Sequence, residues 1–126
     1  MTRLITAVLL VFLAIPVNRA ERSLLHTKEM AAIRQISTVH TAQTLYYSRY
    51  RRYASSMAEL ISGELASGTM GGYRYILRGE AQGYTLNVNP VLYDRTGRRS
   101  FFSDQTLVIR ENRGPEPATA RSGEIR

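Results

Sequence analysis

The feature that most constrains the fold is a change of hydrophobic period part-way along the chain. In residues 27–53, one set of apolar side chains falls within about 140° when plotted at 100° per residue, while Arg34 and Arg52 lie opposite. Beyond residue 72, apolar and polar residues alternate, which is the period of a strand with one buried face. Neither pattern buries its apolar side alone, so the sequence predicts an α+β domain in which one long amphipathic helix packs on a small sheet. The helical stripe consists of Ala32, Ile36, Val39, Ala42, Tyr46, Tyr47, Tyr50 and Tyr53.

Polar residues mark the ends of the expected helices. We expect Thr27 to cap the long helix and Glu29 to complement its dipole. A second, short helix is expected over 57–61, after the serine pair at 55–56.

The second half of the chain predicts an antiparallel sheet of three or four strands. The expected strands are 73–78, 84–89, 100–102 and 106–110, separated by turn-forming residues. Their inward positions should meet the helical stripe. The residues expected to form this core are Ile36, Val39, Tyr46 and Tyr50 from the helix, and Tyr75, Leu86, Val88 and Phe102 from the sheet.

Both ends of the chain differ in composition from this domain, which we place at residues 21–113. Residues 1–20 join a short basic start to an apolar run from Leu4 to Val17, as in a signal peptide or a short membrane anchor. Either reading places the domain outside the cytoplasm: periplasmic or secreted if the segment is cleaved, anchored in the inner membrane if it is kept. Residues 114–126 lack an apolar period, and we expect a disordered tail.

Several short motifs within residues 27–113 resemble those of type IV pilins and of the major pseudopilins of type II secretion. The tyrosine-rich run 46–53 is similar to the end of the long pilin helix. Gly-Tyr-Arg-Tyr at 72–75, Gly-Tyr-Thr-Leu at 83–86 and the segment 99–105, followed by Val108-Ile109-Arg110, resemble the strand signatures of that group.

The resemblance implies a pilin-like fold and a non-enzymatic structural or interaction role. Its partners would be proteins of the cell envelope, such as components of a type IV pilus or a type II secretion system. The Gly-Phe prepilin cut site and the long apolar filament helix are missing from the sequence. The chain thus resembles the globular half of a pilin carried on a different export signal.

The residues that usually carry chemistry do not form recognisable sites. His26 and His40 lack metal-ligand spacing, no Gly-x-Ser-x-Gly motif surrounds a serine, and cysteine is absent. Asp94 and Asp104 could contribute to a calcium loop, but arginines surround them and oppose cation binding. We therefore predict no catalytic residue, no metal site and no cofactor.

A net charge of +7, carried almost entirely by arginine, leaves a second function open. Arg49, Arg51 and Arg52 alternate with tyrosines, a pattern that can bind DNA or acidic glycans. The helical projection separates the two sets, however, and favours arginines on a solvated face above a tyrosine core. Binding of polyanions through these three arginines remains the alternative to the structural role.

Overall fold

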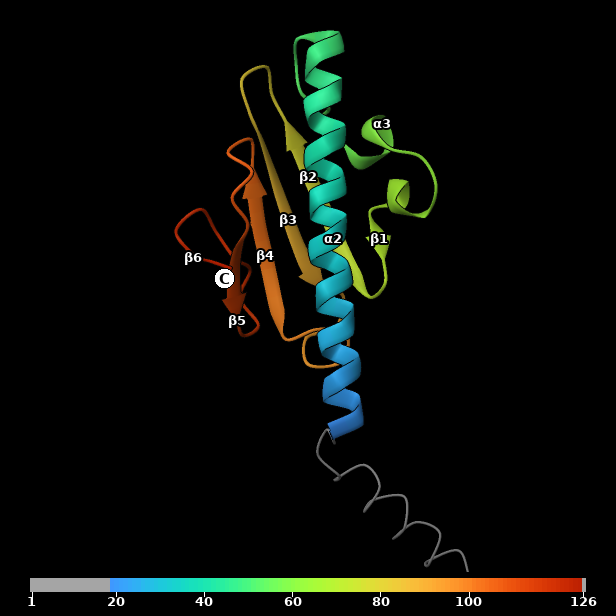
Figure 1. Ribbon diagram of the computed structural model, residues 1–126, viewed down its shortest axis with the longest axis vertical. Helices are drawn as coiled ribbons and strands as arrows, with labels where there is room; N and C mark the ends of the chain where they lie inside the picture. The colour runs from blue at the N-terminus through green and yellow to red at the C-terminus, as the bar shows by residue number, and fades with distance from the viewer. Residues whose placement is uncertain (1–18, 126) are drawn as a thin grey trace, which may run out of the picture.

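The computed structural model describes residues 19–125 (Figure 1). The expected signal peptide or anchor therefore lies outside the described residues, apart from Arg19 and Ala20, which begin the first helix. Among residues 19–125, no helix is long and apolar enough to cross a membrane.

A single helix, α2 (Arg19–Tyr50), runs along one face of the sheet. It begins before the expected residue 27, so Thr27 is not a cap: its hydroxyl donates to the Ser23 carbonyl within the helix. The helix ends before residue 53 because Arg51 adopts a left-handed backbone with φ 57°. The Arg51 N–H still donates to the Tyr47 carbonyl at 2.8 Å, which closes the last turn.

Two short helical segments connect α2 to the sheet. Helix α3 (Met57–Leu60) confirms the second expected helix, and the Ser56 hydroxyl accepts a hydrogen bond from the Glu59 N–H as its cap. A 3₁₀ turn, η1 (Glu64–Ser67), follows and leads into the first strand. Met57 and Leu65 bury their side chains in the core from these two segments.

Within the described residues, the sheet has six antiparallel strands rather than three or four, in the order of the sequence. The strands are β1 (Thr69–Met70), β2 (Tyr73–Gly79), β3 (Tyr84–Pro90), β4 (Arg99–Asp104), β5 (Arg110–Arg113) and β6 (Gly123–Glu124). The two outermost strands, β1 and β6, have two residues each, and a segment that short cannot show the alternation by which a strand is predicted. The fold class is α+β, as the change of period predicts.

Pairing between β2, β3 and β4 directs one row of side chains toward α2. Val88 lies opposite both Tyr75 and Phe101, and Leu86 lies opposite both Leu77 and Ser103. Residues directly opposite each other share a face of a sheet, so this row meets the buried stripe of α2. The core cluster joins Ala32, Ile36 and Val39 of the helix to Tyr73, Tyr75, Leu77, Tyr84, Leu86, Val88 and Phe101 of the sheet.

Five of the eight expected core residues lie in this cluster, and three do not. Phe102 is buried on the opposite face, because the pairing places its neighbour Phe101 toward the helix. Tyr46 is only partly buried, and Tyr50 is 53% exposed, so its assignment to the core is wrong. The helix extends past the sheet core here, and the tyrosines contact one another instead: the Tyr46 and Tyr50 ring centroids lie 4.5 Å apart.

The last residues also differ from expectation. The strand predicted at 106–110 lies instead at Arg110–Arg113, after a turn in which Leu107 has φ 67°. The tail from residue 114 is not disordered up to Ile125: it crosses the back of the sheet and ends in β6. Ala118 is fully buried there, and its carbonyl accepts a hydrogen bond from the Asn87 amide at 3.1 Å. Specific hydrogen bonds rather than an apolar period hold this segment.

Candidate functional site

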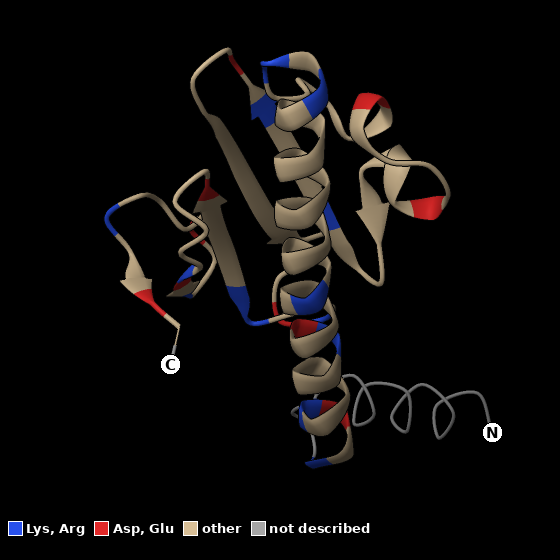
Figure 2. Cartoon of the chain, turned by 45° about the horizontal axis from the view of Figure 1, so that its top comes forward, with Lys and Arg blue, Asp and Glu red and all other residues tan. Residues whose placement is uncertain are grey.

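Charged residues of α2 occur in its N-terminal half, as far as Arg34, and again at Arg49 near its C-terminal end, while residues 35–48 between them carry none (Figure 2). The C-terminal end, with the two residues that follow it, holds Arg49, Arg51 and Arg52, the arginines of the alternative prediction of polyanion binding. The N-terminal end lies beside the β3–β4 loop and forms a pocket. The two ends use their arginines differently.

At the C-terminal end, two of the three arginines, Arg49 and Arg52, already contact nearby side chains of the protein. Arg52 forms an ion pair of 2.8 Å with Glu59 and lies over the Tyr46 ring at 5.4 Å. The Tyr46 hydroxyl also donates to Glu59, and this hydrogen bond is the main reason that the Glu59 pKa falls to about 2. Arg49 lies over the Tyr50 ring at 5.7 Å. Arg52 is thus drawn into a closed local network.

A buried glutamine also closes this end. The Gln43 side-chain amide donates to the Ala54 carbonyl and its oxygen accepts from the Ala54 N–H, both at 2.9 Å. Gly79 lets the chain approach closely, since a Cβ there would lie 1.9 Å from the Ala54 carbonyl oxygen. The loop that follows α2 is therefore fixed against the end of β2.

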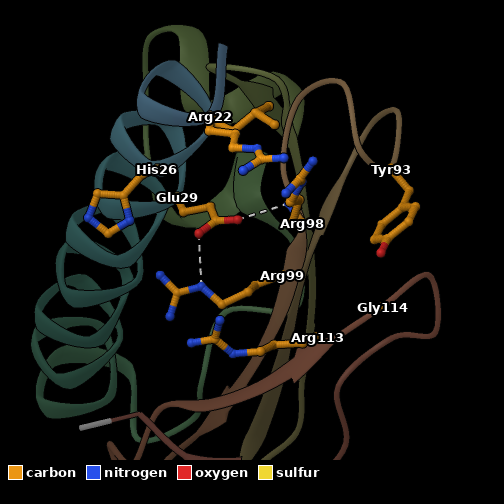
Figure 3. A pocket seen from close by; sticks show the side chains of 9 residues that line it. Arg22, His26, Glu29, Tyr93, Arg98, Arg99, Arg113 and Gly114 are labelled. Atoms are coloured by element: carbon orange, nitrogen blue, oxygen red, sulfur yellow. Dashed lines mark hydrogen bonds and ion pairs between the residues drawn. The ribbon is translucent and has the colours of Figure 1, made fainter. Parts of the chain in front are cut away.

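At the N-terminal end, four arginines surround a pocket of about 370 Å³ (Figure 3). Arg22 comes from the first turn of α2, Arg98 and Arg99 from the start of β4, and Arg113 from the end of β5. Leu25, His26, Glu29, Tyr93 and Gly114 complete its lining. Helix and sheet are far apart in the sequence, so only the fold brings these guanidinium groups together.

Glu29 organises this pocket from the buried stripe of the helix. Its side chain is 8% exposed, accepts from the Arg98 backbone N–H at 2.9 Å and pairs with the Arg99 guanidinium at 2.9 Å. Arg99 also pairs with Glu111 at 2.6 Å and so joins α2, β4 and β5. A buried carboxylate held by two donors is stable only while both remain in place. The pair fixes where the β3–β4 loop returns to the sheet.

The remaining donors at the pocket are available to a ligand. Among residues 19–125, Arg22 has no ion-pair partner, and Arg113 is loosely paired with Glu111 at 3.4 Å and largely exposed. Arg98 uses its Nε for Asp94, and Arg99 uses Nε and one terminal nitrogen for its two carboxylates. The other guanidinium nitrogens can donate to an anion, which is the ligand chemistry that clustered arginines favour.

The pattern of the sequence contained a signal for this site that our reading of it missed. Glu29 stands seven residues before Ile36 and thus on the same helical face. The helix dipole accounts for an acidic residue near the helix start, but a carboxylate on a buried face also requires a cationic partner. The partner, Arg99, lies 70 positions away and follows no local spacing.

One histidine and one serine meet in the interior without forming a catalytic pair. His40 Nε2 lies 2.6 Å from the Ser103 hydroxyl, and that hydroxyl donates to the Val108 carbonyl at 2.7 Å. Because the serine proton is already engaged, His40 donates to Ser103 and does not activate it. In the described part of the chain, no three His, Asp or Glu side chains gather as a metal site.

Comparison of the chain with protein-family models and with curated proteins gives no match in either case.

Proposed function

We propose that the chain is an exported, non-enzymatic pilin-like module that assembles with proteins of the cell envelope, as an accessory to a type IV pilus or a type II secretion system. The observation that carries this proposal is the series of pilin-like motifs at 46–53, 72–75, 83–86 and 99–105, and an α+β fold with one long helix is compatible with it. The motifs that resemble pilins support it, because Gly-Tyr at 72–73 and at 83–84 each introduce one of the two longest strands.

The outer face of α2 suits contact with a neighbouring helix. From Gln35 to Ser48 the helix has no charged residue. The Thr38 and Thr41 hydroxyls donate to backbone carbonyls of their own helix at 3.3 and 3.2 Å, and their methyl groups remain available. Leu45 is 64% exposed on this side. Such a face buries little polar surface when another helix packs on it.

Crosslinking in cells tests the proposal, because the chain has no cysteine and any introduced thiol is unique. Thr41→Cys places a thiol on the outer helix face, and Thr85→Cys places a matched thiol on the back of the sheet. In a bacterium that makes pilus or type II secretion components, we expect thiol-to-amine crosslinks to those components from residue 41 and not from residue 85. Equal adducts from both positions, or none from residue 41, would contradict an assembly role for this face.

Polyanion binding through Arg49, Arg51 and Arg52 is the second proposal. It draws support from Arg49 and Arg51, which are exposed and have no ion-pair partner among the described residues. Changing all three to glutamine should then reduce retention on heparin and lower its dependence on salt. Unchanged retention would dismiss this site.

A further inference from the structure

Four of the large exposed apolar side chains gather at the same end of the molecule as the arginine pocket. Val91, Leu92 and Tyr93 occupy the loop between β3 and β4, and Leu24 lies in the first turns of α2. Leu92 is 60% exposed. A second pocket, lined by Glu21, Leu24, Leu25, Asp94 and Arg95, shows that this loop and the helix start lie side by side.

The loop holds these side chains outward by its own hydrogen bonds. The Arg95 and Thr96 N–H groups donate to the Leu92 carbonyl, and the Thr96 hydroxyl accepts from the Leu92 N–H at 3.1 Å. Gly97 permits the return to β4, since a Cβ there would lie 2.1 Å from the Tyr73 hydroxyl oxygen. An ordered loop with exposed apolar side chains at its tip is typical of a surface that binds a partner or a membrane.

Arginines surround this apolar tip. Arg19, Arg22 and Arg95 are exposed, and none has an ion-pair partner among residues 19–125. The carboxylates at this end have partners: Glu29 and Glu111 pair with Arg99, Asp94 pairs with Arg98, and Glu21 in the first turn of α2 is not free either. Apolar and aromatic side chains at a tip, with unpaired cations around them, match the boundary between lipid headgroups and acyl chains.

We propose that this end of the molecule docks on a membrane rich in anionic phospholipid. Val91, Leu92 and Tyr93 enter the interface, and the arginine pocket receives a lipid phosphate between Arg22, Arg98 and Arg113. Each exposed arginine adds attraction to the negative surface. The connectivity of the chain agrees, because the apolar run from Leu4 to Val17 joins α2 at this same end. The proposal stands independently of any pilus or secretion partner.

The combination of charge and apolar surface selects lipid over nucleic acid. A DNA backbone offers phosphates but no apolar layer for Leu92 and Val91 to enter. A free phosphate ion would fill the pocket and leave the loop exposed. An anionic lipid surface, unlike either of these, satisfies the arginines and the loop together.

The direct test places a fluorescent reporter at each end of β4. In the full chain, Leu92→Cys labelled with a polarity-sensitive dye reports the proposed tip, and Leu107→Cys reports an equally exposed position beyond the far end of that strand, about 20 Å away. With phosphatidylglycerol–phosphatidylcholine vesicles, we expect the dye at residue 92 to shift to a nonpolar signal and the dye at residue 107 to stay near its value in buffer. Vesicles of phosphatidylcholine alone should give a weaker shift at residue 92.

Charge-matched variants then identify the arginines. The triple variant Arg22→Gln, Arg95→Gln and Arg113→Gln should bind the anionic vesicles more weakly, on the order of 100-fold. Arg34→Gln, Arg78→Gln and Arg121→Gln remove the same charge from exposed positions outside both this end and the 49–52 arginines, and should leave the affinity within a few fold. Circular dichroism of both variants checks that they remain folded.

Four results would overturn the proposal. The first is an equal shift at residues 92 and 107, and the second is an equal response to both vesicle types. The third is an equal loss of affinity in the two triple variants. The fourth is a pocket that binds inorganic phosphate or duplex DNA while the dye at residue 92 does not respond to vesicles.

Discussion

At each end of α2 an arginine pairs with a glutamate, and the two ends differ in where that glutamate lies. Glu29, at the N-terminal end, is buried between helix and sheet and determines the position of Arg99 and of the β3–β4 loop. Glu59, at the C-terminal end, lies on the exposed short helix α3 and collects Tyr46 and Arg52 from the surface. The Glu29 carboxylate positions residues that line a pocket, whereas the Glu59 carboxylate binds a tyrosine and an arginine at the surface. A count of arginines in the sequence cannot distinguish these two outcomes.

The chain that follows the C-terminal end of α2 is nevertheless held in place, by hydrogen bonds of a buried uncharged side chain and of the backbone. Gln43 binds both backbone groups of Ala54, and the Tyr53 N–H donates to the Glu80 carbonyl at 3.2 Å. The attachment of the N-terminal end of α2 depends on the ion pairs of Glu29, and that of the C-terminal end depends on the side-chain amide of Gln43. The following predictions separate these contributions, from the largest expected effect to the smallest.

Glu29→Ala should have the largest effect. It leaves the Arg98 N–H without its acceptor and the largely buried Arg99 with one carboxylate fewer, which should cost about 3 kcal/mol in the free energy of unfolding. Urea denaturation of the full chain measures this cost. Glu59→Ala is the matched control and should change stability little, since its partners are at the surface. Similar losses in both variants would remove the distinction between the two ends.

Gln43→Ala should come next, at about 2 kcal/mol, because two buried hydrogen bonds to Ala54 disappear together. Hydrogen exchange of the Ala54 amide should accelerate in the variant. Gln35→Ala, on the same helix but without a side-chain hydrogen bond among the described residues, serves as the control. A Gln43→Ala variant as stable as this control would show that the amide does not fix the loop.

Between the two ends, His40 should make stability depend on pH. Burial lowers the pKa of His40 below its usual 6.5, against a smaller opposing effect of Asp104. The unfolded chain then binds a proton that the folded chain does not, so His40 contributes full stability above pH 6.5, and this is lost progressively as the pH falls below that value. Urea midpoints on either side of pH 6.5 measure the loss. His40→Gln should flatten the profile; an unchanged slope would assign the effect to other groups.

Tyr50→Ala should have the smallest effect, below about 1 kcal/mol. The helical pattern alone assigns Tyr50 to the core, where its truncation would cost about 3 kcal/mol, but the side chain is 53% exposed and contacts mainly Tyr46. Ile36→Ala, in the fully buried part of the stripe, should cost about 3 kcal/mol. Thermal unfolding of the two variants compares them. A loss of several kcal/mol at Tyr50 would restore it to the core.

The sequence predicted the parts of the fold that follow a regular period. The burial of Ile36 and Val39 follows from the helical period, the strands beginning at Tyr73 and Tyr84 and the burial of Leu86 and Val88 follow from alternation, and the change between the two periods predicts the α+β class. The face of Phe102 was wrong because Phe101 and Phe102 are adjacent, and only the pairing of Val88 with Phe101 decides which one faces the helix.

What the sequence did not reveal depends on contacts between distant residues. The strand β6 and the buried position of Ala118 rely on hydrogen bonds to Ser100 and Asn87, in a segment without an apolar period. The arginine pocket likewise joins residues 22, 98, 99 and 113, which no local motif connects. The composition shows that the chain is rich in arginine, but only the fold shows that these four arginines line one pocket with Glu29.

The central proposal is that the domain works outside the cytoplasm. Fractionation of a diderm bacterium expressing the full chain, with the intact mass of the product, tests it most directly. We predict a product in the periplasm or the envelope, either starting at Glu21 or keeping Met1 to Ala20. A soluble product of full mass in the cytoplasm would contradict the claim.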